Sequence, residues 1–131
     1  LYDAGVTDKM PKMIAVQSAG VDPVVRAWEK NLEAPQSITP EHSVADGILV
    51  TVPVRGKQLL SALYETNGFA FRVENDAIMS AQQQMTSRGL IIEPTSAVTV
   101  AALPQIQKTI GDDAMLVLAF TGNGLKNISN G

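Results

Sequence analysis

The chain is organised around residues 88–103, which read Arg-Gly-Leu-Ile-Ile-Glu-Pro-Thr-Ser-Ala-Val-Thr-Val-Ala-Ala-Leu. Gly89 is suited to ending a helix, and the short apolar run 90–92 follows it. Glu93 then precedes Pro94, which fits the first turn of a helix because the N–H that proline lacks would be unpaired there. A carboxylate at Glu93 also lies near the positive end of the helix dipole. The stretch therefore predicts a helix, a short apolar segment and a second helix.

Similar alternation continues on both sides of this stretch. Apolar runs bounded by Gly, Pro or polar residues predict strands at 12–17, 69–73 and 115–120. Helical spacing of apolar residues predicts helices that start at Asp22-Pro23, that span 55–67, and that run from Glu74 or Asn75 to Gly89. The strands are apolar throughout, which is typical of a sheet covered on both faces. We expect one α/β domain, a three-layer α/β/α arrangement with a mainly parallel sheet.

Individual side chains give more specific expectations. Asp22 is placed to cap the helix that follows it, and Trp28 on that helix is expected in the core rather than at a ligand. His42 lies in a polar loop and is expected to face solvent. The helix 55–67 should bury one apolar face that carries Leu59, Leu60 and Leu63.

Composition narrows the possible functions. The 131 residues are 45% hydrophobic, which suits one globular domain, and no apolar run reaches the roughly 18 residues of a membrane span. With no cysteine and with His42 as the only histidine, we expect no metal site. The net charge is −3 and the basic residues are scattered, which argues against a nucleic-acid partner. We expect a cytoplasmic protein without membrane or nucleic-acid partners.

A candidate binding site follows from the expected sheet. Ligands of parallel sheets bind beyond the carboxyl ends of the strands, where the segment Thr121-Gly-Asn-Gly124 is expected. Thr121 offers a hydroxyl donor, and Gly122 lets the backbone lie against a ligand. Gly47, where the chain passes from polar to apolar residues, would also allow a planar group to approach. A tight turn with no ligand explains each of these features equally well.

Several motifs occur together in an order that resembles a known family. They are Ile-Ala-Val-Gln (14–17), Val-Ala-Asp-Gly-Ile (44–48), Pro-Val-Arg-Gly-Lys (53–57), Gly-Leu-Ile-Ile-Glu-Pro-Thr-Ser-Ala (89–97) and Ala-Phe-Thr-Gly-Asn-Gly-Leu-Lys (119–126). The chain resembles the C-terminal third of threonine synthases, in the pyridoxal-phosphate superfamily of tryptophan synthase β and serine/threonine dehydratase. The resemblance covers nearly the whole chain.

The resemblance implies a cofactor, pyridoxal 5′-phosphate, and a role for each candidate residue. Thr121 would bond the pyridine nitrogen of the cofactor, and Glu93 would lie near the same ring edge. Gly47 would lie against a ring face, with Gly122 leaving room for the ligand. The family's Schiff-base lysine has no match in this chain, because none of its lysines, including Lys126 in the Gly-Leu-Lys motif, has the required Ser-x-Lys context. The family's glycine-rich phosphate loop has no match either.

The implied activity is that of a lyase that converts O-phosphohomoserine and water into threonine and phosphate. We expect residues 1–131 to be a single C-terminal segment of a longer enzyme, inactive without the missing N-terminal portion; Leu1 to Gly5 reads like the end of a helix. The resemblance leaves a homodimer open. The alternatives are a cysteate synthase or serine/threonine dehydratase, which keep the fold and take another amino-acid substrate, and a non-catalytic α/β binding module.

Overall fold

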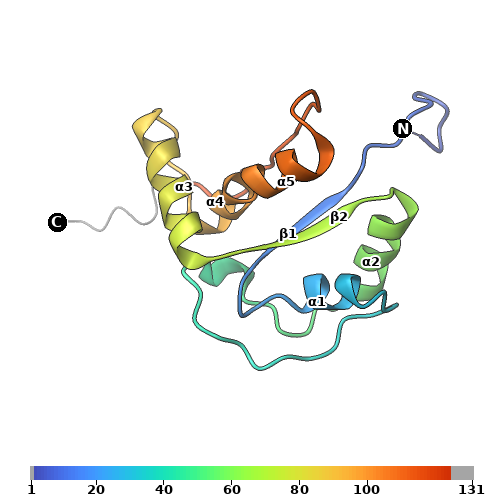
Figure 1. The fold of residues 1–131 in the computed structure, drawn as a ribbon, viewed down its shortest axis with the longest axis horizontal. Helices are drawn as coiled ribbons and strands as arrows, with labels where there is room; N and C mark the ends of the chain where they lie inside the picture. The colour runs from blue at the N-terminus through green and yellow to red at the C-terminus, as the bar shows by residue number, and fades with distance from the viewer. Residues whose placement is uncertain (1, 125–131) are drawn as a thin grey trace.

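The fold is described by a computed structural model for residues 2–124, so Leu1 and Lys126 lie outside the described residues. Strands and helices alternate along the chain (Figure 1). The elements in order are β1 (Ile14–Ser18), α1 (Pro23–Glu29), the 3-10 helix η1 (Asp46–Ile48), α2 (Gly56–Glu65), β2 (Phe69–Val73), α3 (Asn75–Ser87), α4 (Pro94–Ala101) and α5 (Leu103–Ile110).

The two strands pair in parallel, with Ile14 opposite Phe69 and Ser18 opposite Val73. Successive side chains of a strand point to opposite faces, and both faces of this pair are covered. Ile14 and Val16 pack in the cluster beneath α3, α4 and α5, whereas Ala15 packs against α1 and α2. Figure 1 shows the same three layers, with α1 and α2 on one side of the strands and α3 to α5 on the other. The expected three-layer fold with a parallel sheet is confirmed.

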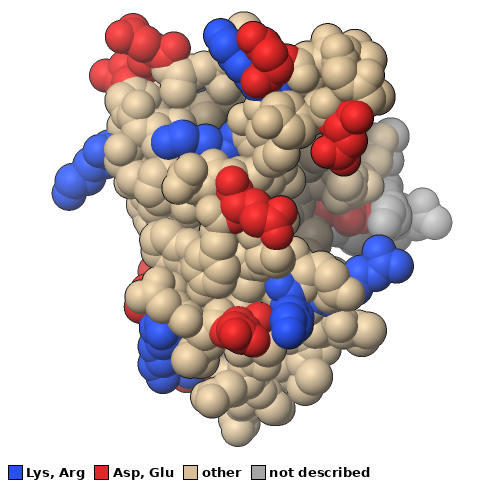
Figure 2. Space-filling view, turned by 90° about the vertical axis from the view of Figure 1, so that its right-hand side faces the viewer, with Lys and Arg blue, Asp and Glu red and all other residues tan. Residues whose placement is uncertain are grey.

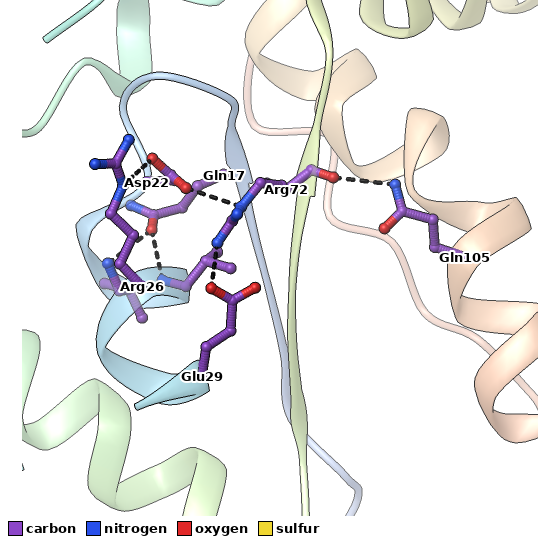
Figure 3. A network of polar contacts seen from close by, with 8 residues as sticks. Gln17, Asp22, Arg26, Glu29, Arg72 and Gln105 are labelled. Carbon is purple, nitrogen blue, oxygen red and sulfur yellow. Dashed lines mark hydrogen bonds and ion pairs between the residues drawn. The ribbon is translucent and has the colours of Figure 1, made fainter. Parts of the chain in front are cut away.

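A charged network joins the sheet to α1 on one of these faces (Figure 3). Asp22, whose side chain is 2% exposed, accepts a hydrogen bond from Arg26 Nε at 2.9 Å. Arg72 of β2 forms ion pairs with Asp22, at 2.9 Å, and with Glu29. The Arg72 Nε contact with Asp22 lacks hydrogen-bond alignment, so attraction between charges is what it contributes.

This network corrects the expected role of Asp22. The residue does occupy the N-cap position of α1, but its carboxylate makes no capping bond because both its oxygens face arginines. Gln17 supplies the cap instead: its Oε1 accepts hydrogen bonds from the backbone N–H groups of Val24 and Val25, at 2.9 and 3.1 Å. The helix start was predictable, and the side chain that satisfies it comes from the neighbouring strand.

Residues 115–120 do not form the strand that their sequence predicts. They are extended without a partner strand, and Met115 and Val117 are 93% and 92% exposed. Among the described residues from 115 to 124, Asn123 forms an antiparallel bridge with Ile92, and no strand is present. The prediction was wrong because an apolar run becomes a strand only where another strand lies alongside to accept and donate hydrogen bonds.

Smaller expectations divide in the same way. Leu60 and Leu63 are buried in α2 as expected, whereas Leu59 is 39% exposed at the edge of that face. Trp28 packs at the edge of the core, edge-on to Phe69, and His42 is exposed, as predicted.

The surface carries charges of both signs. On the face drawn in Figure 2, Lys and Arg side chains are interspersed with Asp and Glu. Within residues 2–124, no helix has the length and apolar character needed to cross a membrane.

Candidate functional site

The first turn of α4 holds the glycine-rich segment that follows residue 120. The Ser96 hydroxyl and the backbone of Gly122 are bonded twice: Ser96 Oγ accepts from the Gly122 N–H at 2.9 Å and donates to its carbonyl at 3.2 Å. The N–H of Glu93 also donates to that carbonyl, at 3.2 Å. Because Ser96 is 2% exposed, these bonds are shielded from water. The segment is therefore fixed against the helix start although no strand leads into it.

Gly47 and Gly122 lie close to the start of α4, and side chains from that region occupy the space beside them. A Cβ atom at Gly122 would overlap the Glu93 carboxylate, and one at Gly47 would lie 2.8 Å from Thr95 Oγ1. A side chain at either position would force Glu93 or Thr95 to shift, although neither glycine has a positive φ. Thr121 is exposed beside Gly122, so its hydroxyl is accessible to a ligand.

The structure thus gathers the predicted site residues around one helix start. Gly122 contacts Glu93, Gly47 contacts Thr95 two residues further on, and Thr121 adjoins Gly122. The prediction that Thr121 ends a strand is wrong, because the residues before it form none. Ala97 of the same helix and Ala102 at its C-cap are fully buried in the core and pack against protein.

Gly47 is carried by a segment that we call the strap, residues 41–47. The strap crosses the carboxyl ends of β1 and β2 and reaches η1, which lies against α4. Its start is fixed by the Glu41 N–H, which donates to the Gly20 carbonyl at 3.1 Å. Gly20 has a φ of +80° and no room for a Cβ, which would lie 2.6 Å from Glu41 Cβ.

Two strand ends hold the middle of the strap. Ser18, the last residue of β1, accepts a hydrogen bond from Ser43 Oγ at 2.6 Å, and both side chains are buried. Asn75, which follows β2, donates to the His42 carbonyl and accepts from the Val44 N–H, at 3.1 and 3.0 Å. Sequence reasoning missed Ser18, Ser43, Asn75 and Ser96. Of these four residues, only Ser96 could have been noticed in the sequence, because it lies three residues after the N-cap residue Glu93.

Two hollows lie elsewhere on the surface. One, of about 420 Å³, is lined by residues of α1, α2 and the turn before β2, including Trp28 and Tyr64. The other, of about 560 Å³, runs along α3 past Met79 and Gln83. Neither is lined by the four predicted site residues.

The sequence matches a known family over most of its length. The family model described as "Pyridoxal-phosphate dependent enzyme" matches residues 3–122. The chain belongs to this family. The expected family and cofactor class are thereby confirmed.

Two curated relatives that the chain matches are named threonine synthase. The threonine synthase of Methanosarcina acetivorans is 36% identical over 129 residues, and that of Methanocaldococcus jannaschii is 31% identical over 126. Each alignment covers 94% of this chain and 31% of the relative. The chain therefore spans about a third of the length of these relatives.

Solved structures in the family show the same fold. Serine racemase from Dictyostelium discoideum superposes with a TM-score of 0.67 at 28% identity, covering 86% of this chain and 34% of that one. A threonine deaminase from the organism abbreviated T.th. gives 0.59 at 22% identity, covering 70% and 33%, and shows the fold alone. The parallel α/β arrangement is that of fold type II pyridoxal-phosphate enzymes.

The residues near the start of α4 have the chemistry that one edge of a pyridoxal-phosphate ring would need. Thr121 is exposed and adjoins Gly122. The Glu93 carboxylate occupies the place where a side chain of Gly122 would lie. A neutral donor and a partly buried acid suit a heteroaromatic nitrogen and its neighbouring substituents. The backbone at Gly122 is held in place by Ser96, so the Thr121 hydroxyl is presented from a fixed segment.

Proposed function

We propose that the chain is the C-terminal part of a threonine synthase, a pyridoxal-phosphate-dependent lyase that converts O-phosphohomoserine and water into threonine and phosphate. The observation that carries the proposal is the fixing of Thr121-Gly122 against the Glu93 end of α4. The curated relatives named threonine synthase support the substrate. A Schiff-base lysine would be supplied by another part of the polypeptide.

Each candidate residue has one task at the cofactor ring. The bound cofactor supplies an electron sink for carbanionic charge. Thr121 donates a hydrogen bond to the pyridine nitrogen, and a neutral hydroxyl does not hold a proton there as a carboxylate would. This favours elimination and replacement over transamination. At Gly47 and Gly122 the backbone would lie close to the ring, and Glu93 would lie at the same ring edge.

The test uses the complete gene product with pyridoxal phosphate. We expect visible absorbance of bound cofactor and release of phosphate from O-phosphohomoserine. Thr121→Val keeps the side-chain shape and removes the donor, so it should shift the absorbance spectrum and lower kcat about tenfold or more. Thr109→Val, which removes an exposed hydroxyl on α5, is the matched control. A gene product that neither binds the cofactor nor releases phosphate rules the proposal out.

A second candidate keeps the site and changes the substrate. The solved structure of a serine racemase, at 28% identity, supports a chain that acts on an unphosphorylated hydroxy amino acid. Parallel assays with serine, threonine, O-phosphoserine and O-phosphohomoserine separate the two candidates, because only the phosphorylated substrates release phosphate. Intact mass of the native product distinguishes both candidates from a stand-alone binding module of this length.

A further inference from the structure

Asn75 bonds two backbone groups that flank one residue of the strap. Its Nδ2 donates to the His42 carbonyl at 3.1 Å, and its Oδ1 accepts from the Val44 N–H at 3.0 Å. One carboxamide thereby replaces the donor and the acceptor that a neighbouring strand would offer. Asn75 is the first residue of α3 and follows β2 closely, so its side chain starts from a well-packed element.

The residue between these two bonds is held from the opposite strand. Ser43 donates to Ser18 Oγ at 2.6 Å, and Ser43 Oγ accepts from the Ala45 N–H at 3.1 Å. Ala45 itself is fully buried in the core. The same short segment is therefore bonded from two places, by Ser18 at the end of β1 and by Asn75 just after β2.

The grip determines where Gly47 lies. Residues 41–45 have no helix or strand of their own, so the bond between Glu41 and the Gly20 carbonyl and several side-chain bonds fix their backbone. Two residues beyond Ala45, Gly47 meets Thr95 in the first turn of α4. A strap released from Asn75 keeps the buried Ala45 anchor and gains freedom at 42–44, so the change stays local.

We propose that Asn75 is a positioning residue. Together with the Ser18–Ser43 pair it fixes the strap, and the strap in turn fixes the Gly47 backbone beside the proposed site for the cofactor ring. This inference rests on the proposed function. It assigns to the first residue of α3 a role at a site that this residue does not touch. The two strand ends and α4 then act as one frame, within which the Gly47 backbone has a single position.

The experiment compares Asn75→Ala and Asn75→Asp in the complete gene product. Amide exchange at Val44 should become about tenfold faster in Asn75→Ala, because its acceptor is lost. Asn75→Asp keeps an acceptor for Val44 and suits the first turn of a helix, so Val44 should stay protected while the His42 bond is lost. The dissociation constant for pyridoxal phosphate, read from its visible absorbance, should rise about tenfold in Asn75→Ala and less in Asn75→Asp.

The control is Ser80→Ala, an exposed position further along α3. It should leave both readouts at the wild-type values. Equal thermal unfolding midpoints show that a variant is folded. If wild-type protein binds the cofactor while Asn75→Ala matches it in Val44 exchange and in affinity, the positioning role is overturned and the proposed function stands. If the wild-type protein binds no pyridoxal phosphate, both are overturned. An effect of Ser80→Ala as large as that of Asn75→Ala also overturns the positioning role.

Discussion

Two apolar runs in this chain have opposite fates. The run 69–73 becomes β2, paired with β1 and covered by helices on both faces, whereas 115–120 stays unpaired with Met115 and Val117 almost fully exposed. Their compositions are similar, so the difference lies in what surrounds them. After α2 the chain passes Gly68 beside Met13, and β2 starts there next to β1. After residues 111–114, by contrast, the run 115–120 does not lie beside a strand. Partners and cover, more than composition, determine which run becomes a strand.

The largest expected effect comes from a change at Gly68, the residue before β2. A Cβ at Gly68 would overlap the Met13 carbonyl oxygen, which accepts a hydrogen bond from the Phe69 N–H. Because the obstacle is backbone, Gly68→Ala should lower the free energy of unfolding by about 3 kcal/mol. Urea denaturation of wild type and variant measures the change.

Gly89→Ala is the matched control for this change. Gly89 has a φ of +84° and nothing within 4 Å of an added Cβ, so only backbone strain applies. Its expected cost is about 1 kcal/mol. Equal losses in the two variants would show that the approach of Gly68 to Met13 is not what limits the pairing of β1 and β2.

The next effect loosens the helix that covers the paired strands. Asp22→Asn removes the charge that Arg26 and Arg72 share, and should cost about 2 kcal/mol because bonds to charged groups are lost from a buried site. Glu33→Gln removes an exposed ion pair to Lys57 by the same chemical change and should cost less than about 0.5 kcal/mol. Urea denaturation compares them. A loss of similar size for both would mean that burial of Asp22 adds nothing.

Much of the paired region could be predicted from sequence. The apolar runs 12–17 and 69–73, Pro23 and Pro94 after their caps, and Gly89 after α3 act through local backbone preferences, and the elements form where these signals stand. The roles of Asp22 and Gln17 could not be predicted in this way. The role of Asp22 depends on Arg72, which strand pairing brings to it across a long stretch of chain, and Gln17 caps α1 from β1.

The candidate site divides along the same line. Glu93 is marked in the sequence by its place before Pro94, and Gly122 by its glycine-rich turn, so the sequence pointed to both positions, and their roles at a cofactor stay predictions. The grip of Ser18, Ser43 and Asn75 on the strap was not, because serine and asparagine in polar segments have many possible partners. Only the paired strand ends bring these three side chains to one segment.

A single chemical change at both runs sharpens the comparison. Val73, 1% exposed, and Val117, 92% exposed, are each replaced by threonine, which keeps the shape and adds a hydroxyl. Val73→Thr should lower the free energy of unfolding by about 1 to 2 kcal/mol, because the new hydroxyl is buried. Val117→Thr should change it by less than about 0.5 kcal/mol, as surface substitutions do. A larger loss at Val117 would mean that 115–120 is covered by another part of the polypeptide or by a second copy.

The smallest effect on folding is expected from changes confined to the unpaired run, and its readout is association. Exposed extended apolar segments pair with other chains, so the 131-residue chain should associate through 115–120. Met115→Lys combined with Val117→Lys should lower the average mass in light scattering while leaving the free energy of unfolding within about 0.5 kcal/mol. Val6→Lys with Met10→Lys makes the same two replacements at another exposed segment and should leave association unchanged. If both pairs reduce association equally, net charge governs it. If only the first pair does, the run that failed to become a strand is the surface through which copies meet.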